Sequence, residues 1–382
     1  MDIALSDNHL MIQRTVRDFA ASEIAPYSAK WDEEGHFPAH VITKLGELGI
    51  TGLIFPSKYG GSDGDMLSLV VALEELAKVD SSVAITIEVL TSLSGPLLLH
   101  FETEEQKQKW LVPMLQGKTI GAFALTEPDT GSDARGITTS AGLVDGHWVI
   151  NGSKSYITNS GSSMTDFIIV AAVTGGNEVG KKEISNIVVP KDAPGLTVGS
   201  SYRKIGWRAS DTHPLFFEDC RVPEGNLLGE RGRGLAQFMK VLDGGRVAIS
   251  AMAVGLIEVS LQMSLAHALK RRAFGKPLSS HQAIQFKLAD MAVSVDLARL
   301  ATYRAAALVD QGLPHKKEAA IAKLFSSEAA LQAVDQAVQI HGGLGFMEDS
   351  PIARFYRDAK ALTIGEGTSE IQRMIIAREL GC

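Results

Sequence analysis

The spacing of apolar residues divides the chain into three sections, of which the first is helical. Apolar side chains recur every three or four positions across residues 6–117, as in Leu67, Val70 and Val71. Pro26 ends the first helix expected in this section, because proline cannot donate the next backbone hydrogen bond. We therefore predict a helical domain over residues 1–118.

Short runs with period-two alternation replace this pattern from residue 119. They are rich in β-branched residues and are separated by turn dipeptides such as Asp145-Gly146. The section predicts an antiparallel β domain over residues 119–232. The expected strands are 121–125, 137–144, 147–158, 167–173, 187–189 and 215–221.

Helical periodicity returns after a glycine-rich turn at 229–234 and continues to the end of the chain. The expected helices are 238–269, 282–311, 317–339 and 369–380, and their length and alanine content predict a bundle over residues 233–382. The order helical, β, helical indicates an α+β fold. It argues against a Rossmann domain, since strands and helices do not alternate and no G-x-G-x-x-G follows a strand.

Composition narrows the possible partners and the compartment. The chain has 382 residues and a net charge of -7 without a run of Lys or Arg, which argues against nucleic acid as a partner. Cys220 and Cys382 are far apart, so neither a disulfide framework nor a zinc site is indicated. The N-terminus lacks the features of a signal peptide, and no apolar run approaches the roughly 20 residues needed to span a bilayer. We expect a cytoplasmic protein with no metal and no membrane span.

The first segment with candidate chemistry is the loop LTEPDTGSDARG at 125–136. It follows a strand and offers successive backbone N–H groups together with the hydroxyls of Thr126, Thr130 and Ser132. Such a set of donors suits the edge of a polar ring or a phosphate. The same composition is also typical of a solvated turn.

Three further segments combine glycines with polar or aromatic side chains. In NGSKSYITNSG at 151–161, Tyr156 and Thr158 are expected on one strand face, where an aromatic ring stacks on a conjugated ligand or packs in the core. In LKRRAFGKPLSSHQA at 269–283, the arginines favour a helix C-terminus or an external phosphate. In QIHGGLGF at 339–346, two glycines permit close backbone approach or simply end a helix.

Glu366 is the candidate general base. It lies between two glycines in IGEGTSEIQ, just before a helix for which Thr368 or Ser369 is the expected N-cap. Glycine neighbours leave the carboxylate open to a bulky substrate. On pattern alone, a solvated carboxylate near a helix N-terminus remains the alternative.

Together and in this order, TEPDTGSD, NGSKSYIT, RRAFG, QIHGGLGF and EGTSEIQR resemble the signatures of the acyl-CoA dehydrogenase family, and the resemblance covers nearly the whole chain. It implies a helical N-terminal domain, a middle β-barrel and a C-terminal four-helix bundle. It also implies FAD as cofactor, an acyl-CoA substrate, a homotetramer, and electron-transferring flavoprotein as electron acceptor.

The resemblance implies three groups of FAD contacts. The isoalloxazine would be lined by Phe123, Leu125, Thr126, Gly131, Ser132, Tyr156, Ile157 and Thr158. The diphosphate and adenine would meet Arg271, Phe274, Gln282, Gln339, Gly342 and Gly343, partly from a neighbouring subunit. Thr368 and Glu370 would complete the site. Most relatives carry Trp at position 156, and many carry Gln at position 370.

By the same resemblance, Glu366 takes the α proton of the thioester while the β hydride goes to the flavin. The substrate contacts would be Ser132, Asp243, Arg246, Gly367 and Glu88. An exposed i,i+3 salt bridge is the alternative for the Asp243/Arg246 pair. In the isovaleryl-type subgroup the base precedes this arginine. Here that position is Gly245, which leaves Glu366 as the candidate.

The sequence indicates the identity of the acyl group less clearly than it indicates the reaction. Gly365 replaces a Tyr that straight-chain members carry, which favours a branched, cyclic or aryl acyl group. Glu88 falls on a helix that lines the acyl cavity in relatives, where it either touches a polar acyl group or faces solvent. Ala84 stands where glutaryl-type members carry Arg, which disfavours a dicarboxyl substrate.

Three other functions fit parts of the pattern. An acyl-CoA oxidase is disfavoured by chain length. An enoyl-CoA reductase would use the same residues in the reverse direction. A non-catalytic acyl-CoA binding protein or helical scaffold is disfavoured by the intact Glu366.

Overall fold

The computed structural model describes residues 4–176 and 182–382, and its first part is helical as predicted. Its α-helices are α1 (Asp7–Phe19), α2 (Ser28–Glu34), α3 (Ala39–Glu47), α4 (Met66–Ala77), α5 (Ser81–Glu88), α6 (Gly95–Phe101), α7 (Glu104–Gln106) and α8 (Val112–Leu115). Short 3-10 or π-helical segments are η1 (Ala20–Ile24), η2 (Ser57–Tyr59), η3 (Val89–Ser94) and η4 (Lys107–Leu111). Asp80 caps α5 by accepting from the backbone N–H groups of Ser82 and Val83. Every residue of α4 and α5 is buried, so these two helices form the centre of the domain.

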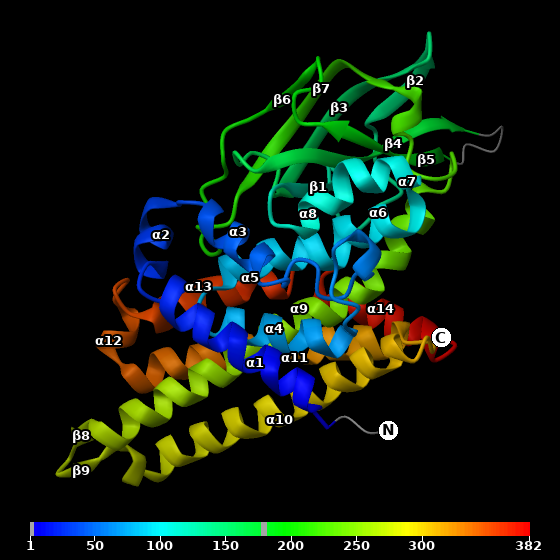
Figure 1. Ribbon diagram of the computed structural model, residues 1–382. Helices are drawn as coiled ribbons and strands as arrows, with labels where there is room; N and C mark the ends of the chain where they lie inside the picture. Colours follow the sequence, from blue (N-terminus) through cyan, green and yellow to red (C-terminus); the bar gives the residue numbers. More distant parts are fainter. Residues whose placement is uncertain (1–3, 177–181) are drawn as a thin grey trace.

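The middle part is a curled β-sheet stacked on one end of the helices (Figure 1). Its strands are β1 (Ile120–Ala124), β2 (Ser140–Val144), β3 (His147–Thr158), β4 (Thr165–Gly176), β5 (Lys182–Pro190), β6 (Leu196–Val198) and β7 (Thr212–Pro223). The order is β1-β4-β2-β3-β7-β6, with β5 paired to β4. All six expected strands are present, and β6 was not predicted because its three residues are too few for alternation to show.

Two features of the predicted β-barrel are wrong. The sheet is mixed rather than antiparallel, because β1 and β2 each pair with β4 in parallel. It is also a half-barrel rather than a closed barrel, since no ladder among the described residues joins β5 to β6. The physical reason is that turn dipeptides identify hairpins between neighbouring strands, such as β2 and β3. The pairing of β1 with β4 crosses that hairpin and leaves no local signal.

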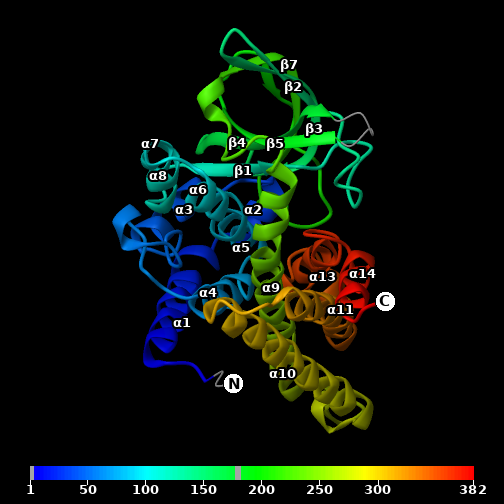
Figure 2. The same cartoon turned by 90° about the vertical axis from the view of Figure 1, so that its right-hand side faces the viewer.

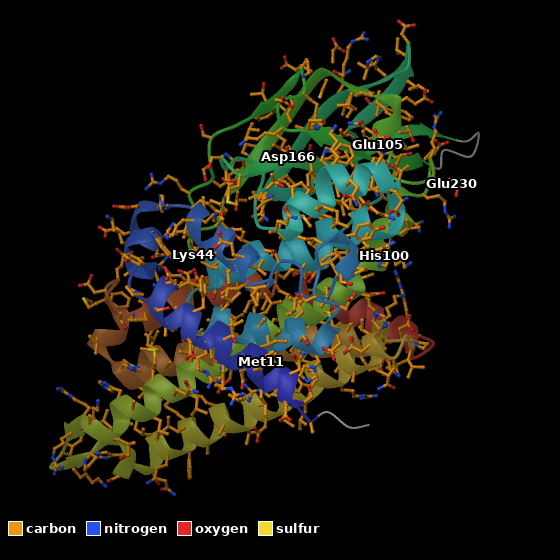
Figure 3. All side chains as sticks on the ribbon, viewed as in Figure 1. Met11, Lys44, His100, Glu105, Asp166 and Glu230 are labelled. Carbon is orange, nitrogen blue, oxygen red and sulfur yellow. The ribbon has the colours of Figure 1, made fainter. Side chains whose placement is uncertain are left out.

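The C-terminal part is built on α9 (Gly234–Lys270), which runs from the sheet between α4 and α11 (Figure 2). A small hairpin of β8 (Arg272–Ala273) and β9 (Lys276–Pro277) turns the chain into α10 (Gln282–Asp310) and then α11 (Lys316–His341). The remaining helices are α12 (Gly343–Phe346), α13 (Pro351–Leu362) and α14 (Ser369–Glu379), and short 3-10 turns are η5 (Glu224–Asn226) and η6 (Leu278–Ser280). Both α13 and α14 pack on α11. Side chains fill the space between sheet and helices (Figure 3).

Two helical stretches have the length and apolar composition of a membrane span, which the sequence analysis did not expect. They are Ser81–Phe101 and Gly234–Lys270. Within their most apolar windows, 89% and 78% of the residues are buried inside the protein. Burial of this extent is typical of core helices, which need apolar surface on all sides.

A buried ion pair fastens the loop after β1 to strand β3. Lys154 is fully buried and donates to Glu127 at 2.8 Å and to the Leu125 carbonyl at 3.0 Å. Glu127 also accepts from the backbone N–H groups of Thr138 and Thr139. Burial alone would raise the pKa of Glu127, but the hydrogen bond and charge of Lys154 outweigh it and lower that pKa to about 2. The loop is thereby held on the sheet at both of its ends.

Lys154→Met should therefore destabilise the fold by about 3 kcal/mol, because it leaves a buried carboxylate without its cation. Urea unfolding at neutral pH measures this. Because the pKa of Glu127 is depressed, the pair stabilises the fold above the ordinary carboxyl range, and the loss should shrink as pH falls toward about 2. Lys44→Met, which removes an exposed partner of Glu23, is the control and should cost under about 1 kcal/mol. Equal losses for both variants would contradict this account.

Candidate active site

Glu366 lies in the turn between α13 and α14, with its backbone in the left-handed region. Its φ is 53°, and φ of Gly367 is 91°. A non-glycine residue held in this region costs about 1 to 3 kcal/mol, so the surroundings must impose it. Thr368 caps α14 by accepting from the Ile371 backbone N–H. The turn places both carboxyl oxygens of Glu366 in the interior, where neither has a hydrogen-bond partner among the described residues.

Two buried side chains donate hydrogen bonds to the carbonyls of this turn. Lys323 on α11 donates from Nζ to the Gly367 carbonyl at 2.7 Å. Gln372 on α14 donates from Nε2 to the same carbonyl at 2.8 Å and to the Glu366 carbonyl at 3.2 Å. Both side chains are fully buried. Donors on two different helices therefore fix the carbonyls of the strained turn.

Sequence reasoning missed Lys323 and Gln372. Lys323 does carry a signal, because it falls on the same helical face as the buried Ala319, Ala320 and Ala322. A lysine on an otherwise apolar face must find an acceptor. For Gln372, which follows a capped helix start, the sequence offers no comparable signal.

Helix α9 passes directly beneath the Glu366 carboxyl at Gly245. A Cβ placed on Gly245 would lie 2.4 Å from Oε2 of Glu366 and 2.9 Å from its carboxyl carbon. Only a residue without a side chain permits this approach. The glycine noted in the sequence thus clears the space that the Glu366 carboxyl occupies.

Glu88 meets Glu366 from the other side. It ends α5, is fully buried, and has no hydrogen-bond partner for either carboxyl oxygen among the described residues. The alternative that Glu88 faces solvent is wrong, because α5 is enclosed between the sheet and α9. Burial raises the pKa of Glu88 well above its ordinary value, and the charge of the neighbouring Glu366 raises it further.

The Glu366 carboxyl is also close to two buried cations. Burial raises its pKa, whereas an interaction with Glu88 and the charges of Arg246 and Lys323 act in the opposite direction. Arg246 on α9 is 4% exposed and pairs with Asp243, so this pair is not the exposed surface salt bridge considered as its alternative. Burial lowers the pKa of Lys323 to about 8.

A cavity of about 660 Å³ opens beside the Asp243 end of this cluster. It is lined by Asp243, Gly312, Leu313, Pro314, His315, Lys316, Lys317, Glu318 and Glu379. Lys316 and Lys317 begin α11, and His315 is the N-cap residue of that helix. Asp243 thus belongs both to the lining of this cavity and to the buried ion pair with Arg246.

The residues assigned to the isoalloxazine come together on the sheet. Phe123 on β1 packs on Phe238 of α9 at 4.1 Å between ring centroids. The Ser155 backbone N–H donates to the Thr126 carbonyl at 2.9 Å, which brings the loop 125–136 alongside β3. Residues Leu125, Ile157 and Thr158 belong to the same region, and Gly131 and Ser132 are exposed on the loop.

Strand β3 also reaches the helix that carries Glu88. Asn159, at the end of β3, donates from Nδ2 to the Thr86 carbonyl at 3.3 Å. Tyr156 has a φ of 62° at an irregularity in the pairing of β3, and its ring is 64% exposed. We expected Tyr156 and Thr158 to alternate regularly along β3, but the strand is irregular at Tyr156. The ring also packs on Tyr202, with 5.1 Å between the two centroids. The exposed part of this ring and the space at Gly131, where a Cβ would meet nothing within 4 Å, suit a flat conjugated ring such as that of FAD.

The residues assigned to the diphosphate and adenine lie elsewhere. They are Arg271, Phe274, Gln282, Gln339, Gly342 and Gly343, and all are exposed. Arg271 follows the last residue of α9, roughly 38 Å along the helix from Arg246. Figure 1 shows the β8-β9 hairpin at the opposite end of the molecule from the sheet. One chain therefore does not bring both groups together, whereas Thr368 and the exposed Glu370 remain close to Glu366.

Comparison with known families matches all three parts of the chain. The profile "Acyl-CoA dehydrogenase, N-terminal domain" matches residues 6–118. The profile for the middle domain of the same family matches residues 122–220, and that for its C-terminal domain matches residues 232–381.

Individual relatives extend over the whole chain. "Probable acyl-CoA dehydrogenase YngJ" of Bacillus subtilis is 50% identical over 380 residues, which are 100% of both chains. The solved structure of butyryl-CoA dehydrogenase from Megasphaera elsdenii has a TM-score of 0.96 and 41% identity, covering 100% of both chains. An acyl-CoA dehydrogenase complexed with FAD from Bacillus anthracis has a TM-score of 0.93 and 34% identity, covering 98% of this chain and 67% of that one.

Lys323→Met should loosen the turn that carries Glu366, because the Gly367 carbonyl loses one of its two buried donors. We expect amide hydrogen exchange in the peptide covering residues 363–369 to rise about tenfold, which corresponds to a loss of about 1.4 kcal/mol of local protection. Lys30→Met, at an exposed lysine of α2, should leave that peptide unchanged. Unaltered exchange in the Lys323 variant would show that the turn is held by other contacts.

Proposed function

This chain belongs to the acyl-CoA dehydrogenase family, whose members are FAD-dependent oxidoreductases acting on acyl-CoA, and we propose that it forms the 2-enoyl-CoA with Glu366 as the base. The environment of the Glu366 carboxyl supports this proposal most directly. It is buried, without a hydrogen-bond partner among the described residues, and cleared by Gly245. Burying an unpaired carboxyl destabilises the fold, and such groups are typical of sites that act on a ligand.

The burial of the Glu366 carboxyl supports its proposed role in taking the α proton of the thioester. The α C–H of a thioester is a very weak acid, so a carboxylate in water is a poor base for it. Burial raises the pKa of Glu366 and thereby improves the match between base and acid. The bound FAD supplies the acceptor for the β hydride. The chain itself supplies the base, its orientation and the exclusion of water.

The backbone of the same turn supports binding of the thioester carbonyl. The N–H of Glu366 makes no hydrogen bond within the described part of the chain. A donor fixed beside the base stabilises negative charge that develops on the carbonyl oxygen, as in an oxyanion hole. Lys323 and Gln372 hold this peptide in place through the neighbouring carbonyls.

The CoA portion fits the cavity beside Asp243. Lys316 and Lys317 line it and supply positive charge for the phosphates of CoA. Lys316 already pairs with Glu379 at 3.0 Å, so a phosphate would compete with a carboxylate for it. Asp243 lines this cavity and pairs with Arg246, whose charge acts on Glu366.

For the acyl group we propose a short chain that is branched, cyclic or aryl. A Cβ on Gly365 would meet only the Ala361 carbonyl oxygen within 4 Å, at 3.6 Å, so space is available next to the base. Ala84 offers no cation for a second carboxylate, and neither does Glu88. Both features support a substrate with a neutral acyl group.

The separation of the two groups of FAD residues supports a homotetramer, in which the β8-β9 hairpin of one copy completes the site of another. The hairpin side chain Phe274 is 96% exposed, which suits a contact with a second copy. We further propose that electron-transferring flavoprotein reoxidises the cofactor and that the protein works in the cytoplasm.

Anaerobic bleaching of the bound flavin tests the reaction directly. Straight, branched, cyclic and aryl acyl-CoAs should bleach the wild-type protein to different extents, with the fastest member reporting the acyl class. Glu366→Gln should lose at least about 10³-fold in rate while it keeps FAD, since the amide cannot accept the proton. Retained bleaching in this variant would remove Glu366 as the base. Absence of bleaching by every saturated thioester would favour an enoyl-CoA reductase or a binding protein.

Gly245→Ala should slow bleaching about 100-fold, because the added methyl group displaces the Glu366 carboxyl by the order of 1 Å. Gly244→Ala is the matched control on the same helix, since a Cβ there meets nothing within 4 Å. Rates are compared in single-turnover experiments with FAD-loaded protein. Equal rates in the two variants would mean that Glu366 does not react from the position seen here.

The assembly is tested at the hairpin. Arg271→Glu should weaken retention of FAD and reduce the size of the particle in sedimentation, although Arg271 is far from Glu366 within one chain. Lys44→Met, an exposed change on α3, should alter neither. A monomeric wild-type protein that retains FAD would contradict the proposed sharing between copies.

A further inference from the structure

Glu88 and Glu366 form a pair of carboxyl groups inside the protein. Glu88 comes from α5 and Glu366 from the turn before α14, so the pair depends on packing between segments that are far apart in the sequence. All four oxygens are buried, and none has a conventional hydrogen-bond partner among the described residues. Each carboxyl nevertheless acts electrostatically on the other.

Two carboxylates at close range in a dry site do not both ionise. Burial of one unpaired carboxylate is already costly, and a second like charge adds repulsion that water is not present to screen. Pairs of this kind keep one proton between them. The question is which carboxyl holds it.

The surroundings assign the charge to Glu366. Lys323 from α11 donates to the carbonyl of Gly367, the residue after Glu366, at 2.7 Å. Arg246 follows Gly245, the residue of α9 on which a Cβ would meet the Glu366 carboxyl. The positive charges of both side chains favour the ionised form of Glu366. Burial and the Glu366 carboxyl raise the pKa of Glu88, and no cation among the described residues lowers it. Asp243 is already paired with Arg246. The negative charges of Glu328 and Glu370 act on Lys323. The proton therefore lies on Glu88 and the negative charge on Glu366.

We propose that Glu88 is a positioning residue that holds one proton beside the Glu366 carboxylate, so that the pair carries a single negative charge. The proposal rests on the proposed function, in which Glu366 is the base. A protonated Glu88 offers its O–H toward Glu366, which keeps the base ionised and oriented although it is shielded from water. It also leaves the acyl site with less negative charge than two ionised groups would give.

Ionisation of Glu88 has a definite consequence. Proton removal from the α carbon places negative charge on the thioester, and a second carboxylate nearby would oppose it. Flavin reduction should therefore fall at alkaline pH as Glu88 loses its proton. Lys323 also titrates in this range, since its pKa is lowered to about 8, and its loss of charge would be a competing cause.

The rate of anaerobic bleaching by butyryl-CoA across the pH range separates these causes. Glu88→Gln keeps a donor but does not ionise, so the alkaline decline should disappear while the acid limb stays in place. Glu88→Leu removes the donor, which raises the pKa of Glu366, so its acid limb should move up by about one pH unit. A shift of one pH unit corresponds to about a tenfold lower rate of bleaching at pH values below the pKa of Glu366.

Glu102→Gln is the matched control. Glu102 follows α6, is 6% exposed, and has no partner for its carboxyl oxygens in the described structure, so burial raises its pKa to about 8. It lies outside the cluster around Glu366. Its variant should keep the alkaline decline, which separates a specific effect of Glu88 from a general effect of removing a buried carboxyl.

Protein stability supplies a readout that does not depend on turnover. Because folding raises the pKa of Glu88, its contribution to stability is complete below the unfolded pKa and is lost as pH rises through the folded value. The free energy of unfolding of Glu88→Gln should therefore increase relative to wild type as pH rises. The comparison uses FAD-loaded protein and urea unfolding.

The outcomes are distinct. An alkaline decline that persists in Glu88→Gln would assign it to Lys323 and overturn the proposal, as would a stability difference that does not change with pH. Bleaching that persists in Glu366→Gln would refute the proposed base, whatever the Glu88 variants show. Loss of the alkaline decline in Glu88→Gln, together with the shifted acid limb in Glu88→Leu, would establish that Glu88 holds the proton.

Discussion

The structure depends on keeping one carboxyl group, that of Glu366, out of water. Its burial requires a backbone turn in the left-handed region, a glycine on α9 that leaves room for it, and two buried donors that hold the carbonyls of the turn. These parts come from α9, α11 and α14 in the C-terminal helices, and Glu88 on α5 brings the N-terminal helices to the same place. The cost of the strained turn and of the unpaired carboxyl falls on the stability of the fold, and in the proposed reaction the gain is a base with an elevated pKa.

The groups around this carboxyl shift its pKa in both directions. Burial favours the neutral acid, whereas Arg246 and Lys323 favour the carboxylate. Glu88 adds a second carboxyl, and in our proposal its proton prevents a second negative charge. The proposed result is an ionised base in a dry site, where a base is strong because water does not compete for the proton. Lys323 serves this balance twice, since it also donates to the Gly367 carbonyl.

Local patterns in the sequence predicted much of this. Helical spacing identified the long helices, and alternation identified six strands. The glycines around Glu366 marked it as a candidate base but did not show that its carboxyl oxygens are buried. The sequence did not show that β1 pairs with β4 or that the sheet stays open, because those pairings cross a hairpin. It also left Glu88 undecided and Lys323 unnoticed, since the partners of both residues lie on segments that are remote in the chain. Burial of a charged residue is decided by tertiary packing, which a single helical pattern does not contain.

The most direct test of the account follows the α hydrogen of the substrate itself. Butyryl-CoA deuterated at the α carbon is mixed anaerobically with FAD-loaded protein, and release of the label to water is measured beside flavin reduction. The account predicts that the wild-type protein releases the label as the flavin is reduced and that Glu366→Gln releases none. Release at the wild-type rate by Glu366→Gln would contradict the central claim that the buried Glu366 carboxylate takes the proton.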